Sequence, residues 1–160
     1  MSRVLGIDPS NLHSAFCVMD SETFRPIVFD KVENEVLRES LRSGEIQFDE
    51  VAIEDMQNFG SVMGRTCLDT EKEIGRLMEI LETAGYTVNF VYRTQEKMCI
   101  CHTVKANDAT IRRALIDKFA TTENGKGTKQ RPDFFYKFRE DIWNAYAVAL
   151  VHALRGERLI

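Results

Sequence analysis

The order of apolar segments along the 160-residue chain constrains its fold more than any other feature. Three strand-like segments, residues 3–8, 14–19 and 26–32, come first and are joined by short turns, which is typical of an antiparallel meander. Two further strand-like segments, residues 51–54 and 87–92, each follow a helix-like segment. Since helical crossovers connect parallel strands, the sequence predicts an α/β domain with a mixed five-stranded sheet and flanking helices.

Four segments are expected to be helical: residues 33–43, 70–84 and 107–119, and a closing helix that begins near Glu140. In residues 70–84, apolar side chains recur at the i, i+3, i+4, i+7 spacing of a helix that packs against a core. The closing helix carries a broad apolar face, so it is expected to be a core element as well.

Chain length and composition fit a single domain over residues 1–160. Hydrophobic residues make up 44% of the sequence, enough to build a core, and no repeat or low-complexity linker divides it. No run approaches the ~18 consecutive apolar residues of a membrane span, and no secretory signal is visible before the first strand. We therefore expect a soluble, cytoplasmic protein that makes no membrane contact.

The cysteines raise the question of a zinc site, because Cys99, Cys101 and His102 are close in sequence. A structural zinc site takes four ligands, usually from two paired elements, and the sequence has no second Cys/His pair. The four cysteines are therefore interpreted as reduced, buried or half-buried thiols.

Charge is distributed unevenly along the chain, although the total is only −4. Residues 20–57 carry eleven acidic and four basic side chains, whereas residues 93–139 carry eleven basic and five acidic ones. An acidic protein can still bind a polyanion through a local basic surface. The second region, which includes the exposed basic stretch 125–129, is the candidate for such a surface.

Two carboxylates stand at the ends of predicted buried strands: Asp8 after the first and Glu54 after the fourth. If these strands are parallel neighbours, both carboxylates emerge at the same edge of the sheet. Asp141 opens the closing helix, and Asn144 lies one turn further on the same side. Taken singly, these residues also suit turns and helix caps. Together they predict a site of oxygen ligands for Mg²⁺ or Mn²⁺.

At this point the sequence resembles a known family. Residues 5–10, 51–54 and 141–149 look like the three acidic motifs of RuvC-type Holliday-junction resolvases, and the order of elements follows that family over nearly the whole chain. Residues 105–119 and 125–129 look most like the shorter RuvC-like proteins of phages, which would act in the host cytoplasm. The resemblance implies a ribonuclease H-like fold, a homodimer, and metal-dependent cleavage of branched DNA such as four-way junctions.

The resemblance also implies roles for individual residues. Asp8, Glu54 and Asp141 would be catalytic metal ligands for two Mg²⁺ or Mn²⁺ ions in each active site. Asn144 would complete the set, but it stands where the family usually has a further carboxylate, and an amide holds a cation less strongly. This departure weakens one metal position, favours Mn²⁺, or is compensated by Asp55 or Glu140.

Lys105 lies near the catalytic-side lysines of the family, where it would contact the scissile phosphate as a point charge. Its alternative interpretation is a solvated loop lysine. Other basic residues would follow DNA backbones without reading sequence. The set comprises Lys97, Lys105, Arg112, Arg113, Lys126, Lys129, Arg131, Lys137 and Arg139.

Aromatic residues near these segments are candidates for stacking on bases. Phe59, in the loop after Glu54, resembles in position the aromatic residue that RuvC-type proteins insert into the junction core. Residues 134–136, Phe-Phe-Tyr between basic residues, are a second candidate, although aromatics in such places are more often part of the core. By family analogy the helix at residues 70–84 is the expected dimer surface.

Three alternatives stay open. A nuclease of the same fold that cuts RNA or RNA–DNA hybrids would carry the same carboxylates, so only substrate tests separate the two. Sugar kinases and actin-like ATPases also have a first strand ending in Gly-Ile-Asp, but they need a second such domain and a second glycine-rich phosphate turn. A non-catalytic branched-DNA-binding relative is kept as an alternative because of Asn144.

Overall fold

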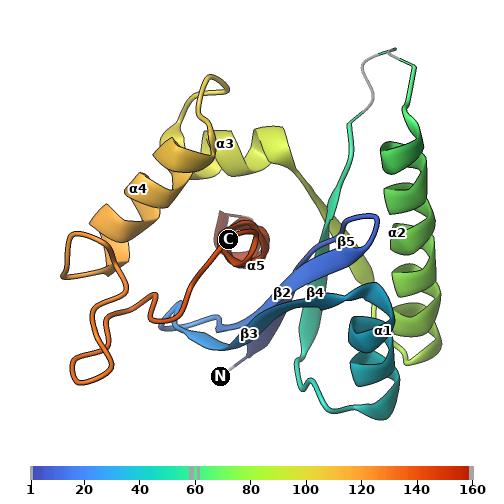
Figure 1. Ribbon diagram of the computed structural model, residues 1–160, viewed down its shortest axis with the longest axis horizontal. Coiled ribbons are helices and arrows are strands. Elements are labelled where there is room, and N and C mark those ends of the chain that lie inside the picture. Colours follow the sequence, from blue (N-terminus) through green and yellow to red (C-terminus); the bar gives the residue numbers. More distant parts are fainter. Residues whose placement is uncertain (1, 58–59, 61, 159–160) are drawn as a thin grey trace.

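The computed structural model describes residues 2–57, 60 and 62–158 (Figure 1). Its five strands are β1 (Arg3–Asp8), β2 (His13–Asp20), β3 (Pro26–Glu33), β4 (Glu50–Asp55) and β5 (Val88–Tyr92). Its helices in the described part of the chain are α1 (Asn34–Ser43), α2 (Arg65–Thr83), α3 (Arg93–Cys101), α4 (Asp108–Phe119) and α5 (Ile142–Arg158). None of the helices in these residues is both long and apolar enough to cross a membrane.

The five strands form one mixed sheet in the order β3-β2-β1-β4-β5. β1 pairs antiparallel with β2, and β2 pairs antiparallel with β3, so the predicted meander is confirmed. β4 lies parallel to β1 and also parallel to β5. The prediction of a mixed sheet with parallel strands carried by helical crossovers is therefore confirmed as well.

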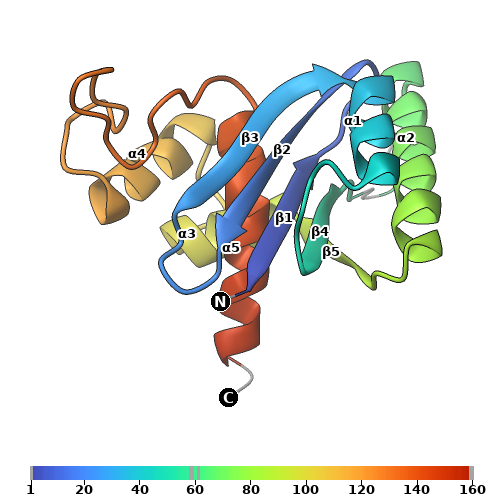
Figure 2. The same cartoon turned by 90° about the horizontal axis from the view of Figure 1, so that it is seen from below.

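Helices cover both faces of the sheet and form a separate apolar core on each (Figures 1 and 2). α5 crosses one face, and α3 and α4 pack on that side, where an aromatic cluster joins α4, α5 and the segment between them. α1 and α2 cover the other face, with the buried stripe Ile74, Leu77 and Leu81 of α2 against the sheet. The predicted stripe of residues 70–84 is thus a core stripe.

α5 lies unusually close to β1 because Gly6 has no side chain. A Cβ atom at Gly6 would lie 2.2 Å from the Ala145 carbonyl oxygen and 2.7 Å from the Ala149 nitrogen, both in the α5 backbone. Glycine at this point of the strand therefore permits the backbones to approach each other. The close approach brings the start of α5 next to the end of β1.

The sequence-based helix assignment was wrong in one place, since α3 was not predicted. The only residue of α3 that is fully buried is Glu96, so the helix carries no apolar stripe that periodicity could detect. Its start is stabilised instead by Gln95, whose side-chain oxygen accepts a hydrogen bond of 2.9 Å from the Tyr92 backbone N–H. α2 also begins five residues earlier than expected, at Arg65.

Candidate metal and nucleic-acid site

Strand register brings Asp8 and Glu54 to the same end of the sheet. Ile7 of β1 is the parallel partner of Ile53 of β4, and each strand continues into its carboxylate. Side chains alternate between the two faces of a strand, so Asp8 shares the face of Gly6, on which α5 packs. Glu54 shares the face of Ala52, which packs against Val148 of α5. The two carboxylates therefore emerge on the same face, as the sequence predicted.

The start of α5 completes this group. Asp141 immediately precedes α5, and Asn144 lies in its first turn. The Asn144 side-chain amide lies within hydrogen-bonding reach of the Asp8 carboxylate and acts to lower its pKa, whereas the Asp141 charge acts to raise it. The structure thus brings together the four residues singled out in the sequence, from two strands and one helix.

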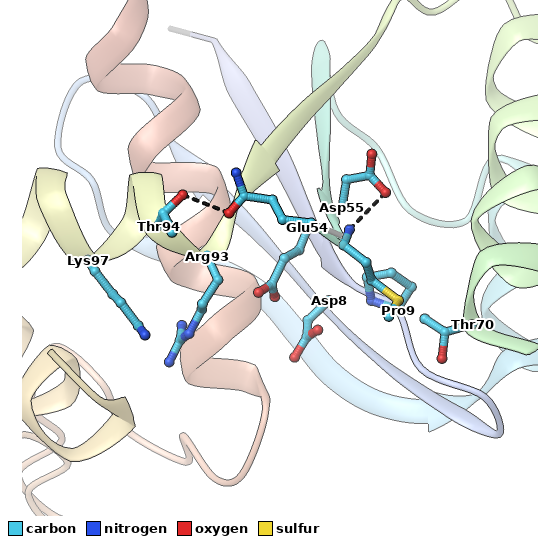
Figure 3. A pocket seen from close by; sticks show the side chains of 10 residues that line it. Asp8, Pro9, Glu54, Asp55, Thr70, Arg93, Thr94 and Lys97 are labelled. Atoms are coloured by element: carbon cyan, nitrogen blue, oxygen red, sulfur yellow. Dashed lines mark hydrogen bonds between the residues drawn. The ribbon is translucent and has the colours of Figure 1, made fainter. Parts of the chain in front are cut away.

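Asp8 and Glu54 line a pocket of about 490 Å³, whereas Asp141 and Asn144 are not among its lining residues. Figure 3 shows the side chains of Asp8 and Glu54 pointing toward each other, with Arg93 and Lys97 extending from α3 toward the same space. On one side, the Thr94 hydroxyl donates a hydrogen bond of 2.9 Å to Gln57, which connects α3 to the segment after β4. Residues that line the pocket are Asp8, Pro9, Glu54, Asp55, Met56, Gln57, Thr70, Arg93, Thr94 and Lys97.

Burial and mutual repulsion make this a site that favours a cation. Burial, followed by the charge of Glu54, raises the pKa of Asp8 well above its usual range. Burial, followed by the charge of Glu96, raises the pKa of Glu54 to about 8. Such carboxyl groups retain protons to higher pH than usual, and a bound cation would take the place of those protons.

Glu96 is a buried carboxylate of this site that sequence reasoning missed. It lies within hydrogen-bonding reach of Glu54, and burial raises its pKa to about 7. Arg93 Nη1 lies 2.8 Å from Glu96 Oε1, and the same guanidinium pairs with Asp108 at the start of α4. The spacing of Arg93 and Glu96 was the only sequence signal, and it requires knowing that residues 93–101 are helical.

Asp141 is already paired with a cation of the protein. The ammonium of Lys31, on β3, lies 2.9 Å from Asp141 Oδ2 and 3.9 Å from Glu140 Oε1. Glu140 also pairs with Arg139 at 2.7 Å. Glu140 is thus held in ion pairs, whereas Asp55 lines the pocket and accepts a hydrogen bond from the Met56 backbone N–H.

The donors fit a hard divalent cation in kind. Asp8, Glu54, Asp141 and Asn144 offer only oxygen ligands, which Mg²⁺ and Mn²⁺ prefer. Glu54 Oε2 is buried without a hydrogen-bond partner, an oxygen for which a cation would be the natural partner. In the conformation described here, however, no three acidic, histidine or cysteine side chains among residues 2–57, 60 and 62–158 stand close enough to hold a metal ion. That includes Cys99, Cys101 and His102.

The basic residues are placed at different distances from this pocket. Arg93 and Lys97 line the pocket. Lys105 is not among the described residues that line it and is exposed in the loop between α3 and α4. The guanidinium of Arg112 stacks over the Trp143 ring at 5.3 Å, and Arg113 pairs with Asp117 at 2.8 Å. These two arginines therefore have structural contacts besides any role toward DNA.

The segment between α4 and α5 carries the exposed basic residues and is ordered by one carboxylate. Asp133 accepts hydrogen bonds from the backbone N–H groups of Thr121 and Thr122 and of its own neighbour Phe134. The Thr122 hydroxyl, which also donates a hydrogen bond to Asp133, followed by these backbone N–H groups, holds the pKa of Asp133 well below its usual range. The predicted basic loop is thus a defined structure, and Figure 2 shows it connecting α4 with the start of α5. It presents Lys126, Lys129, Arg131 and Lys137.

The aromatic candidates have different outcomes. Phe59 lies outside the described residues, so its stacking role stays a prediction. The hypothesis that residues 134–136 stack on bases is wrong for Phe135, which is completely buried in the core beneath α5. Phe134 stacks on Phe119 with ring centroids 4.9 Å apart, so its face is used within the protein. These aromatic rings stabilise the fold more when they are buried in the core than when they are exposed to solvent.

Solved structures match the whole of this arrangement, whereas no protein-family model and no curated protein matches the sequence. RuvC of Thermus thermophilus in complex with a Holliday junction substrate has a TM-score of 0.73 and 17% identity, over 99% of this chain and 96% of that chain. A second Thermus thermophilus RuvC structure has a TM-score of 0.69 and 18% identity, over 98% and 96%. The chain therefore has the RuvC fold, a ribonuclease H-like architecture, over nearly its full length. The closer likeness to phage proteins stays a prediction.

Proposed function

We propose that this protein is a metal-dependent, structure-selective endodeoxyribonuclease that resolves Holliday junctions and other branched DNA. The observation that carries the proposal is the convergence of Asp8, Glu54, Asp141 and Asn144 at one end of the sheet. The likeness to a RuvC structure bound to a Holliday junction substrate supports branched DNA as the substrate. The products would be intermediates or end points of DNA recombination and repair.

In the proposed reaction a water molecule attacks the phosphorus in line with the leaving oxygen, and no covalent intermediate forms. Asp8, Glu54, Asp141 and Asn144 would hold two Mg²⁺ or Mn²⁺ ions, which supply activation of the water and stabilisation of the leaving oxygen. Asn144 orients Asp8 through its amide. Lys97 faces the pocket and would offset the charge of the scissile phosphate, and Lys105 would approach it from its loop.

DNA binding is proposed to use the basic residues around the pocket. Lys129, Arg131 and Lys137 are exposed and Lys126 is half-buried, and all four lie in the segment that leads into α5. Arg112 and Arg113 would contribute charge, and Phe59 would enter the junction core. A homodimer, with α2 as its proposed interface, would present two equal sites to the two-fold junction and cut it symmetrically.

The test is cleavage of labelled four-way junctions, matched linear duplex and RNA–DNA hybrid in Mg²⁺, Mn²⁺ or EDTA. Asp8→Asn is expected to reduce junction cleavage by more than about a hundredfold, because it removes a charged ligand. Glu45→Gln, an equal change of charge at an exposed residue after α1, is the matched control and is expected to cleave like the wild type. Cleavage of hybrid but not of junctions would contradict the proposal.

Asn144 supplies the second arm of this experiment. Asn144→Asp restores the carboxylate that the family usually has at this position. Junction cleavage by the wild type would show that the amide suffices. Junction binding without cleavage, with activity gained only in Asn144→Asp, would instead identify a DNA-binding protein with an incomplete active site, the function that the neutral amide itself favours.

A further inference from the structure

We propose that Lys31 is the resident counter-cation of Asp141 and determines how tightly this protein binds a second divalent cation. The inference rests on the proposed function, because it takes Asp8, Glu54 and Asp141 as metal ligands. It concerns a residue of β3, a strand that carries none of the acidic motifs, and it follows from strand register and ion-pair geometry.

Strand register places Lys31 in line with Asp8 across three strands. Asp8 of β1 pairs with Ala15 of β2, and Ala15 pairs with Lys31 of β3. Paired residues project from the same face of a sheet, so Lys31 lies on the α5 side, two strands from Asp8. Ala15 between them is small and buried, which leaves room for the lysine chain to reach the start of α5.

The contact at the end of this lysine is specific. Lys31 Nζ lies 2.9 Å from Asp141 Oδ2, a charge-assisted hydrogen bond, and the bond raises the pKa of Lys31. The side chain of Lys31 is only 23% exposed, whereas that of Asp141 is 43% exposed. The ammonium is therefore less exposed than the carboxylate that it contacts, and the Asp8 charge also acts on it.

The balance of charges in the site indicates how the Lys31–Asp141 contact affects metal binding. Two divalent cations bring four positive charges to a ligand set of three carboxylates and the neutral Asn144, and Lys31 adds a fifth. The buried Glu96 does not correct the excess, because Arg93 pairs with it. One divalent cation between Asp8 and Glu54 would leave the Lys31–Asp141 pair intact, whereas a second cation at Asp141 would be repelled by the ammonium and would compete with it for that carboxylate.

Lys31 is not needed to hold the start of α5 in place. The neighbouring Arg139 pairs with Asp30 of β3 at 3.0 Å, and the Ala145 N–H donates to the Asp141 carbonyl oxygen. Asp141 is also partly solvated, so it does not become a buried, unpaired charge when Lys31 is removed. Lys31 variants are therefore expected to fold.

The experiment is calorimetric titration of the DNA-free protein with Mn²⁺, for the wild type, Lys31→Met and Lys31→Arg. We expect the wild type to bind one Mn²⁺ tightly, and Lys31→Met to bind a second with affinity increased about tenfold, since a unit charge within a few ångströms of a divalent ion is removed. Lys31→Arg keeps the charge and is expected to behave like the wild type. Lys118→Met, at an exposed lysine of α4, controls for the loss of a positive charge elsewhere.

The outcomes separate this inference from the proposed function. Equal affinity for the second Mn²⁺ in the wild type and Lys31→Met would overturn the role of Lys31, while loss of the first Mn²⁺ in Asp8→Asn would still support the metal site. A tenfold gain in Lys31→Met without any junction cleavage would support Lys31 and contradict the nuclease. Absence of Mn²⁺ binding in every variant would overturn both.

Discussion

Buried carboxylates that face one another determine how single residues of this site respond to pH. Glu54 and Glu96 are within hydrogen-bonding reach of each other, and Arg93 is a direct cationic partner of Glu96. In the unfolded chain both side chains are solvated and ionise near pH 4.5. In the folded, metal-free chain they retain protons to higher pH.

We therefore predict that the free energy of unfolding of the metal-free protein falls as pH rises from about 5 to 8. In this window the folded state binds more protons than the unfolded state, so the pH derivative of the unfolding free energy is negative. Each retained proton contributes up to about 1.4 kcal/mol per pH unit, and the slope ends above the folded pKa of Glu54, about 8.

Urea unfolding in EDTA at several pH values measures this slope. Glu54→Gln has no group to titrate at this position and is expected to show a shallower decline. Saturating Mn²⁺ is expected to reverse the trend, because ligation replaces the protons. A pH-independent unfolding free energy in the wild type would contradict the prediction.

At the scale of elements, the contact between β1 and α5 decides whether the site exists. β1 carries Asp8 at its end, α5 carries Asn144 in its first turn, and Gly6 lets the two backbones touch. Neither element alone contains a complete ligand set. The separation of these two elements therefore sets the distance between Asp8 and Asn144.

We predict that Gly6→Ala lowers the free energy of unfolding by about 1–3 kcal/mol, because the new methyl group overlaps the α5 backbone. It is also expected to weaken Mn²⁺ binding, since α5 has to move away from β1. Gly75→Ala on α2 is the matched control: nothing lies within 4 Å of its Cβ, and alanine stabilises a helix by up to about 1 kcal/mol. Chemical denaturation of the wild type and both variants measures these free energies of unfolding. A Gly6→Ala variant as stable as the wild type would contradict the prediction.

At the scale of the whole molecule, a protein with a formal charge of −4 carries a basic segment between α4 and α5. The loop that carries Lys126 and Lys129 is ordered by Asp133 and continues into α5. Binding to DNA through such residues releases counterions from the phosphates. Its strength then depends on salt concentration rather than on DNA sequence.

We predict that replacing Lys126 and Lys129 together by alanine weakens junction binding and lowers the slope of log affinity against log salt concentration by about 2. Fluorescence anisotropy of the Asp8→Asn protein in Ca²⁺, at salt concentrations from about 50 to about 200 mM, measures this slope without cleavage of the DNA. Lys118→Ala is expected to keep the wild-type slope. An unchanged slope in the double variant would mean that the DNA does not contact the loop that carries Lys126 and Lys129.

Much of the architecture was predictable because it depends on local patterns. Short apolar segments bounded by turns predicted the five strands, and the 3.6-residue periodicity of apolar side chains predicted four of the five helices in the described part of the chain. The carboxylates Asp8 and Glu54 were predicted to meet because parallel neighbouring strands end at the same edge of a sheet. α3 was not predicted because its only fully buried residue is Glu96, which an analysis of hydrophobic periodicity counts as exposed.

The sheet, its crossovers and the acidic residues at its edge could thus be predicted from the sequence, since they follow from local apolar patterns and from the geometry of strand ends. Which charges meet at that edge depends on the packing of distant elements. Lys31 reaches Asp141 and Glu96 reaches Glu54 through contacts between elements far apart in sequence, 110 and 42 positions respectively. The strength and the sign of the electrostatic field in the site come from those long-range pairs, and no local pattern encodes them.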